Sequence, residues 1–184
     1  MGKHLSILDD SIQKFIEAQP LFFVGSAPLD SDGHINISPK GHDTLRVLGP
    51  RTVVYLDLTG SGIETVAHLK ENGRIVLMFC AFQGPPKIVR LHGQGSVVEP
   101  QDEKFRELAA HFAEYEGTRA IILVEISRIS DSCGYSVPQL RYEGERNQLS
   151  AWAHKLGPDG LKRYRAEKNR ESIDQIPGLA DPQK

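Results

Sequence analysis

A glycine-rich turn joins a predicted strand to a predicted helix, and this pattern could bind an anion. Thr52–Leu58 reads as a strand, Gly60 and Gly62 follow it, and a helical pattern begins directly afterwards. Glycines let backbone amides turn toward a ligand, and the amino end of a helix carries partial positive charge that suits a phosphate. Thr65 stands where the dinucleotide-binding fingerprint needs a third glycine, and no P-loop lysine follows. An ordinary strand-to-helix turn in which Ser61 caps the helix is the alternative.

A lysine at the end of another predicted strand is a second candidate for anion binding. The run Ser38-Pro39-Lys40-Gly41 ends this strand. Because proline cannot donate a hydrogen bond to a central ladder, we expect this end to lie at an edge or rim of a sheet. Lys40 could face an anion there, or it could simply be solvated.

Five basic residues gather near the end of the chain. Lys162, Arg163, Arg165, Lys168 and Arg170 lie within nine residues, whereas the preceding part of the chain is acidic on balance. A solvated helix face is one explanation of such a run. The other is a helix that lies over an anionic ligand or an acidic partner surface.

The residue types that bind metals or hydrolyse bonds form no known motif in this chain. The seven histidines include no H-x-x-x-H pair, and Cys80 and Cys133 are the only cysteines. No G-x-S-x-G nucleophile elbow is present. We therefore expect neither a metal site nor a hydrolase.

Short strands joined mostly by tight turns must position these residues. We count about six strands, with helices predicted over His4–Gln19, from Ile63 to Asn72, over Asp102–Tyr115, and in the tail around Ser150–Lys155 and Asp159–Lys168. Short turns favour antiparallel neighbours, and a closed barrel leaves fewer exposed edges than an open sheet. We predict a mainly β protein with helices (α+β), a six-stranded antiparallel barrel, ahead of a doubly wound α/β sheet.

Length and composition limit the classes of protein. A chain of 184 residues is one domain's worth, and we expect a barrel core over about 20–130 with a helical extension over 131–184. The formal net charge of −2 argues against a nucleic-acid-binding protein. No apolar run is long enough to span a bilayer, and no signal peptide opens the sequence. We expect a cytoplasmic protein that binds neither nucleic acid nor membrane.

The order of several motifs resembles one flavoprotein family. The motifs are F-F-V-G-S-A-P, D-G-H-I-N-I-S-P-K-G, T-V-V-Y-L-D-L-T-G-S-G-I-E-T, E-N-G-R-I-V-L-M-F, K-I-V-R-L-H-G-Q-G and S-C-G-Y-S-V-P, with S-I-D-Q-I-P-G-L in the tail. Together they resemble the pyridoxamine 5′-phosphate oxidase-related FMN-binding proteins, in an uncharacterised branch, over roughly residues 5–180. The resemblance implies a split β-barrel, a homodimer, and flavin mononucleotide (FMN) in clefts between the subunits.

The resemblance also implies a set of FMN-binding positions. They are Asn36, Ser38, Pro39, Lys40 and Gly41 along the flavin ring, Asp57, Leu58 and Thr59 at the end of the next strand, Ser61, Gly62, Glu64 and Thr65 around the phosphate, and Arg90 and Gln94 on the strand after the Pro-Pro turn. The vitamin-pathway oxidases carry an Arg-Lys pair where Glu64-Thr65 stands here. A carboxylate beside a phosphate is unfavourable without a cation, so Lys40, Arg74 or Arg90 would have to supply the charge.

The expected function is that of an FMN-dependent oxidoreductase acting on a small molecule of unknown identity. No side chain is assigned as general acid or base. The alternative is a binding protein on the same barrel that holds haem or a deazaflavin without turnover. A haem iron would need an axial ligand, for which His34, His42, His92 and Tyr55 are the available types. A dimerisation module with an empty cleft is a third possibility.

Overall fold

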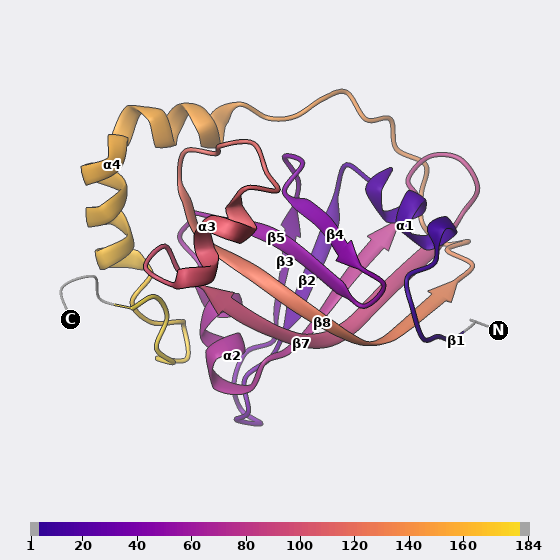
Figure 1. Cartoon of the computed structure of the whole chain (residues 1–184), viewed down its shortest axis with the longest axis horizontal. Helices are drawn as coiled ribbons and strands as arrows, with labels where there is room; N and C mark the ends of the chain where they lie inside the picture. The colour runs from indigo at the N-terminus through magenta and orange to yellow at the C-terminus, as the bar shows by residue number, and fades with distance from the viewer. Residues whose placement is uncertain (1–3, 181–184) are drawn as a thin grey trace.

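Eight strands and four helices make up the computed structural model, which describes residues 4–180 (Figure 1). In chain order they are β1 (His4–Leu5), α1 (Asp10–Glu17), β2 (Phe22–Ser26), β3 (Asn36–Lys40), β4 (Leu45–Gly49), β5 (Thr52–Leu58), α2 (Glu64–Asn72), β6 (Arg74–Cys80), β7 (Ile88–Val98), α3 (Glu103–Ala109), β8 (Thr118–Ser132) and α4 (Gln148–Lys168).

All strand pairs in the sheet are antiparallel, as the short connections predicted. The order is β3-β2-β6-β7-β8-β5-β4, and β1 also pairs with β8. The first and last strands of this order, β3 and β4, follow each other in the chain across only four residues, yet no pairing joins them among the described strands. The barrel is therefore split between β3 and β4, and the prediction of an antiparallel split barrel is confirmed.

The predicted number of six strands is wrong. The sheet has eight strands. One of them, β1, has only two residues, which is too short for an alternating pattern to be recognised in the sequence. It falls inside the single helix predicted over His4–Gln19, of which only Asp10–Glu17 is helical. The apolar residues of this segment keep a helix-like spacing in the sequence because Leu5 and Leu8 pack against the same core as Ile12 and Ile16.

The central strands are buried on both faces. Along β5, Val53 and Tyr55 point into the barrel interior, while Val54 and Leu56 pack on the outer side together with Leu108 of α3. Two cores thus use alternate residues of one strand, which explains the continuous apolar runs in the sequence. Helices α1 and α2 contribute to the interior core.

The C-terminal helix lies at one end of the molecule (Figure 1). A long segment without helix or strand connects it to the end of β8. Gly157 has non-helical backbone angles and Pro158 follows it, so α4 consists of two helical segments, as predicted. Among residues 4–180, no helix combines the length and apolar character that crossing a membrane requires.

Candidate functional site

A hollow of about 590 Å³ opens where the split between β3 and β4 reaches the end of β5. Five of the predicted positions line it, namely Pro39, Lys40, Gly41, Leu58 and Thr59. The rest of the lining comes from the segment before α4 and from Pro20, Leu21, His42, Thr44, Leu56, Gly60 and Leu149. We call this space the split-end hollow. Its volume is in the usual range for small-molecule sites.

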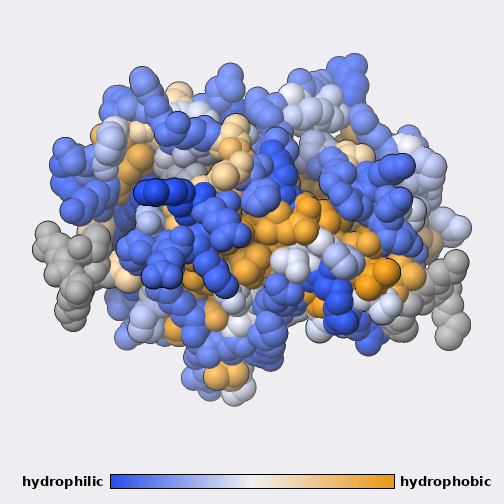
Figure 2. Space-filling model, in the orientation of Figure 1, coloured by the Kyte–Doolittle hydropathy of each residue, from blue (hydrophilic) through white to orange (hydrophobic). Residues whose placement is uncertain are grey.

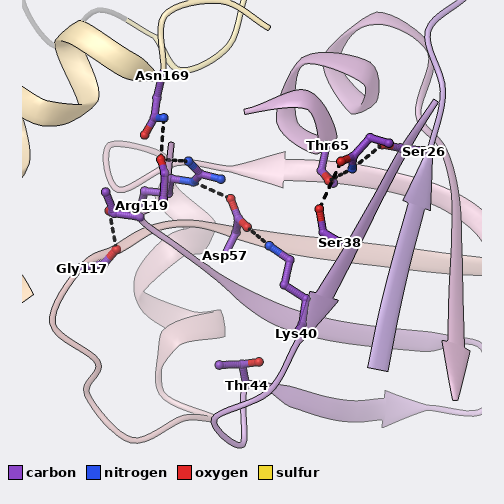
Figure 3. Close-up of polar contacts among 12 residues, drawn as sticks. Ser26, Ser38, Lys40, Thr44, Asp57, Thr65, Gly117, Arg119 and Asn169 are labelled. Atoms are coloured by element: carbon purple, nitrogen blue, oxygen red, sulfur yellow. Dashed lines mark hydrogen bonds and ion pairs between the residues drawn. The ribbon is translucent and has the colours of Figure 1, made fainter. Parts of the chain in front are cut away.

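Lys40, which lines the split-end hollow, belongs to an ion-pair network built on the buried Asp57 (Figure 3). Lys40 Nζ lies 2.8 Å from Asp57 Oδ1, and Arg119 Nε lies 2.7 Å from Asp57 Oδ2. The Asp57 side chain is fully buried, and that of Arg119 is only 5% exposed. Burial acts to raise the pKa of the Asp57 carboxyl, but Lys40 and Arg119 outweigh burial, and the pKa lies below its usual value. The network therefore holds a carboxylate and two cations, with one positive charge in excess.

Three residues that the sequence reasoning did not place in the site, namely Arg119, Arg165 and Asn169, bind the two residues that follow β5. Arg119 Nη1 donates to the Gly60 carbonyl at 3.2 Å, and Arg165 Nε of α4 donates to Thr59 Oγ1 at 2.9 Å. Thr59 Oγ1 in turn donates to the Gly117 carbonyl at 2.6 Å. Asn169 Nδ2 also donates to the Gly60 carbonyl. The sequence offered two signals for these residues: Arg119 is a charged residue at the start of an apolar strand, and Arg165 belongs to the basic run in the tail.

A second polar cluster joins the start of β3 to the start of α2 (Figure 3). Asn36 Nδ2 donates to Thr65 Oγ1 at 2.9 Å, and Ser38 Oγ donates to Asn36 Oδ1 at 3.2 Å. Behind them, Ser26 Oγ lies 3.0 Å from His68 Nδ1. Burial lowers the pKa of His68, which favours its neutral form. The cluster brings together three predicted positions from two distant segments.

The start of α2 differs from the capping arrangement considered from the sequence. The residue before the helix is Ile63, with no side-chain capping bond, so the interpretation of Ser61 as the cap is wrong. Glu64 begins the helix, and its carboxylate folds back over the turn. A Cβ placed on Gly62 would lie 2.6 Å from Glu64 Oε2. The position that would favour an anion is thus next to a carboxylate of the chain itself.

Two further predicted positions, Arg90 and Gln94, belong neither to the lining of the split-end hollow nor to the polar cluster at the start of α2. Arg90 of β7 donates to Ser132 Oγ at 3.1 Å. Gln94, in the middle of β7, packs against Gly73 so closely that a Cβ at Gly73 would collide with it. Gly73 itself adopts the left-handed conformation expected at a helix end, with φ 71°.

The side chains that a haem iron would need are dispersed. Of His34, His42, His92 and Tyr55, only His42 lines the split-end hollow. His34 pairs with Asp174, and Tyr55 is fully buried in the barrel core. Residues 4–180 contain no group of three or more His, Cys, Asp or Glu side chains arranged to hold a metal ion.

The fold and its hollow define a class of small split-barrel proteins, and comparisons with known proteins agree. HupZ of Group A Streptococcus superposes with a TM-score of 0.53 at 20% identity, over 73% of this chain and 99% of that chain. A Clostridium acetobutylicum protein related to general stress protein 26, of the pyridoxinephosphate oxidase family, gives 0.52 at 16% identity, over 68% and 91%. At these identities the likeness concerns the fold.

Sequence comparison establishes the family. Residues 8–133 match the family model described as pyridoxamine 5′-phosphate oxidase. The pyridoxamine 5′-phosphate oxidase family protein ustO of Aspergillus flavus is 38% identical over 189 residues, which cover 94% of this chain and 76% of that protein. The chain belongs to the pyridoxamine 5′-phosphate oxidase family, and the resemblance seen in its motifs is confirmed.

Proposed function

We propose that the chain is an FMN-binding flavoprotein that acts as an oxidoreductase on a small molecule, with the flavin ring in the split-end hollow. The observation that carries the proposal is the position of Lys40. It lies on the wall of a ligand-sized hollow, held by a buried carboxylate, in a protein of the pyridoxamine 5′-phosphate oxidase family. A fixed cation of this kind suits a flavin, whose ring gains negative charge when it is reduced.

The residues of the split-end hollow fit a flat aromatic ring. Pro39, Leu56 and Leu58 supply apolar walls, and Gly41 and Gly60 expose backbone without side chains. Lys40 and Arg146 are the lysine and arginine of the lining, and the Lys40 side chain remains 19% exposed. An apolar slot with a few fixed polar groups is the usual composition of a cofactor site.

The residues around the start of α2 fit the phosphate less simply. The uncapped helix end and the hydroxyls of Ser61 and Thr65 favour an anion. Glu64 opposes it. FMN bound at this position would therefore displace the Glu64 carboxylate from its place over Gly62.

The roles of the protein side chains follow from this placement. When bound, FMN supplies the transfer of electrons or hydride that the amino acids themselves cannot perform. Lys40 would place a positive charge at the ring, and Asp57 and Arg119 would hold Lys40 in position. Asn36 and Ser38 would present polar groups along β3. No side chain of the hollow is assigned as general acid or base.

A homodimer is part of the proposal. Strand β3 ends the sheet, and Ile35 and Ile37 near its start are 76% and 69% exposed. Exposed apolar residues on an edge strand are a liability that a partner chain would cover. A second copy at this edge would close the flavin cleft from the outside.

The spectrum of the purified protein tests the proposed function. We expect the absorbance bands of oxidised flavin, either as purified or after addition of FMN at micromolar concentration. A Soret band would instead support the haem-binding alternative. A colourless protein that takes up no FMN at micromolar concentration would exclude the proposal.

Replacing Glu64 by glutamine is expected to tighten FMN binding about threefold to tenfold, because the change removes a negative charge beside the phosphate. Riboflavin, which lacks the phosphate, should bind both forms equally. The measurement is the quenching of flavin fluorescence on titration with each ligand. Glu103, in the first turn of α3, is the matched control, and its change to glutamine should affect neither ligand. Equal gains for FMN and riboflavin would show that Glu64 does not face the phosphate.

A further inference from the structure

A second hollow, separate from the split-end hollow, lies between α4 and the barrel. Its volume is about 520 Å³, and four cationic side chains line it: Arg119, Lys162, Arg165 and Arg170. We call it the cationic pocket. Its lining shares no residue with that of the split-end hollow. The basic run that the sequence left unexplained therefore supplies three side chains to one concave site.

The charges of the cationic pocket are largely uncompensated by the chain. Glu99 is the one carboxylate in its lining, and Lys70 Nζ lies 2.5 Å from Glu99 Oε1. Glu99 also accepts a hydrogen bond from the Ala180 amide. Within residues 4–180, Lys162, Arg165 and Arg170 form no ion pair with a carboxylate. Arg119 already pairs with Asp57, so the uncompensated positive charge of the pocket comes from Lys162, Arg165 and Arg170.

Arg165 is held in place before any ligand arrives. Its Nε donates to Thr59 Oγ1 at 2.9 Å and its Nη2 donates to the Thr118 carbonyl at 3.2 Å. Burial and the neighbouring Arg119 both lower its pKa. Crowded, partly buried guanidinium groups are unfavourable alone, and an anion between them relieves the repulsion. Preorganised arginines also lose little freedom on binding.

The two hollows lie on opposite sides of one thin wall. Thr59 and Gly60 line the split-end hollow, while Arg165 and Arg119 bind these same two residues and line the cationic pocket. The surface over α3 and α4 is largely hydrophilic (Figure 2). Pro100, Ala166 and Leu179 add an apolar portion to the pocket lining.

We propose that the cationic pocket is a second ligand site, which binds a small molecule through a phosphate group. Arginine forks match the oxygens of a phosphate, and Lys162 adds a point charge. The apolar portion of the lining accommodates the organic part of a phosphate ester. This site goes beyond the flavin function, because its ligand approaches from the α4 side of the wall.

Titration calorimetry with pyrophosphate as the probe tests the proposal. We expect saturable binding in the millimolar range or tighter, weakened by added sodium chloride because the contacts are ionic. The double variant Lys162→Gln with Arg170→Gln should bind at least about tenfold more weakly. Both side chains are exposed, so the change should leave folding intact. Absence of pyrophosphate binding to the wild-type protein would overturn the proposal.

A matched control distinguishes binding in the cationic pocket from binding caused by the overall positive charge of α4. Lys155→Gln with Arg163→Gln removes two exposed cations from the same helix, outside the lining of the pocket. It should bind pyrophosphate as the wild type does. An equal loss in this control would overturn the proposal, because charge anywhere on α4 would then explain the binding.

FMN titration of the same double variant separates the two proposals. FMN affinity should be unchanged when Lys162 and Arg170 are replaced. A matching loss of FMN would show that the pocket holds the flavin phosphate, and a second site would be excluded. Pyrophosphate binding that depends on Lys162 and Arg170, in a protein that binds no FMN, would uphold the second site and reject the flavin function.

Discussion

Replacing Asp57 by asparagine is expected to lower the free energy of unfolding by about 3–5 kcal/mol, because it leaves two cations without their carboxylate in a buried position. Arg119 is nearly inaccessible to water, so it cannot recover hydration. Asparagine keeps the size of the side chain, so packing changes little. Urea unfolding of wild-type and variant protein measures the difference.

An exposed ion pair provides the control for the Asp57 variant. Arg141 and Glu143 lie 2.8 Å apart with side chains 82% and 75% exposed. Glu143→Gln removes the same charge and should cost less than about 1 kcal/mol. If the Asp57 variant lost no more than this control, the buried network would not stabilise the fold as described.

The contribution of Asp57 should depend on pH in a defined direction. Its pKa in the folded protein lies below the ordinary value of 3.8, so the folded state favours the carboxylate. The stabilisation is fully present above about pH 5 and decreases as the pH falls through the folded pKa. Wild-type and Asp57→Asn stabilities should therefore converge in acid. A difference that stays constant down to acidic pH would contradict the ionised network.

Replacing Lys40 by methionine is expected to weaken FMN binding about tenfold or more, because it removes the fixed cation from the flavin side of the split-end hollow. The reduction potential of any flavin that still binds should become more negative, since the reduced ring loses a compensating positive charge. Potential is informative here because a loss of packing alone would not shift it in this direction. Asp57 keeps Arg119 as its partner in this variant.

Lys104 on α3 supplies the control for Lys40. It is exposed and lies outside the hollow, so Lys104→Met should leave both affinity and potential unchanged. Urea unfolding of the Lys40 variant checks that it remains folded at the temperature of the titration. A folded Lys40→Met protein with wild-type affinity and potential would remove Lys40 from the site.

Most strands could be predicted because the pattern of apolar residues in each strand reflects which of its side chains are buried. The predicted segment Thr52–Leu58 matches β5, and the Asn72-Gly73 helix end matches the left-handed cap. The helix predicted over Asp102–Tyr115 ends already at Ala109 in α3. Phe112 and Tyr115 lie in the loop after α3 and pack against the outer core. Their spacing in the sequence therefore resembled that of a buried helix face. Tertiary packing, which periodicity cannot report, overrode the pattern here.

The candidate site was predictable where a local pattern or a family motif marked its residues. Lys40 was a candidate from its place at a strand end, Asp57 was named only through the resemblance, and the structure places them 2.8 Å apart. Arg119 and Arg165 were missed because they reach the site across 62 and 106 residues of sequence. Nothing in their local sequence indicates which strand end they contact. Contacts of this range depend on how the barrel closes and where α4 lies.

The most direct test of the central claim is a crystal structure of the protein grown with FMN. We predict flavin density in the split-end hollow, with the ring against Pro39 and Leu58 and a ring atom within hydrogen-bond distance of Lys40 Nζ. A second chain should cover the ring from the β3 edge. Flavin density elsewhere on the barrel, with this hollow filled only by solvent, would contradict the account.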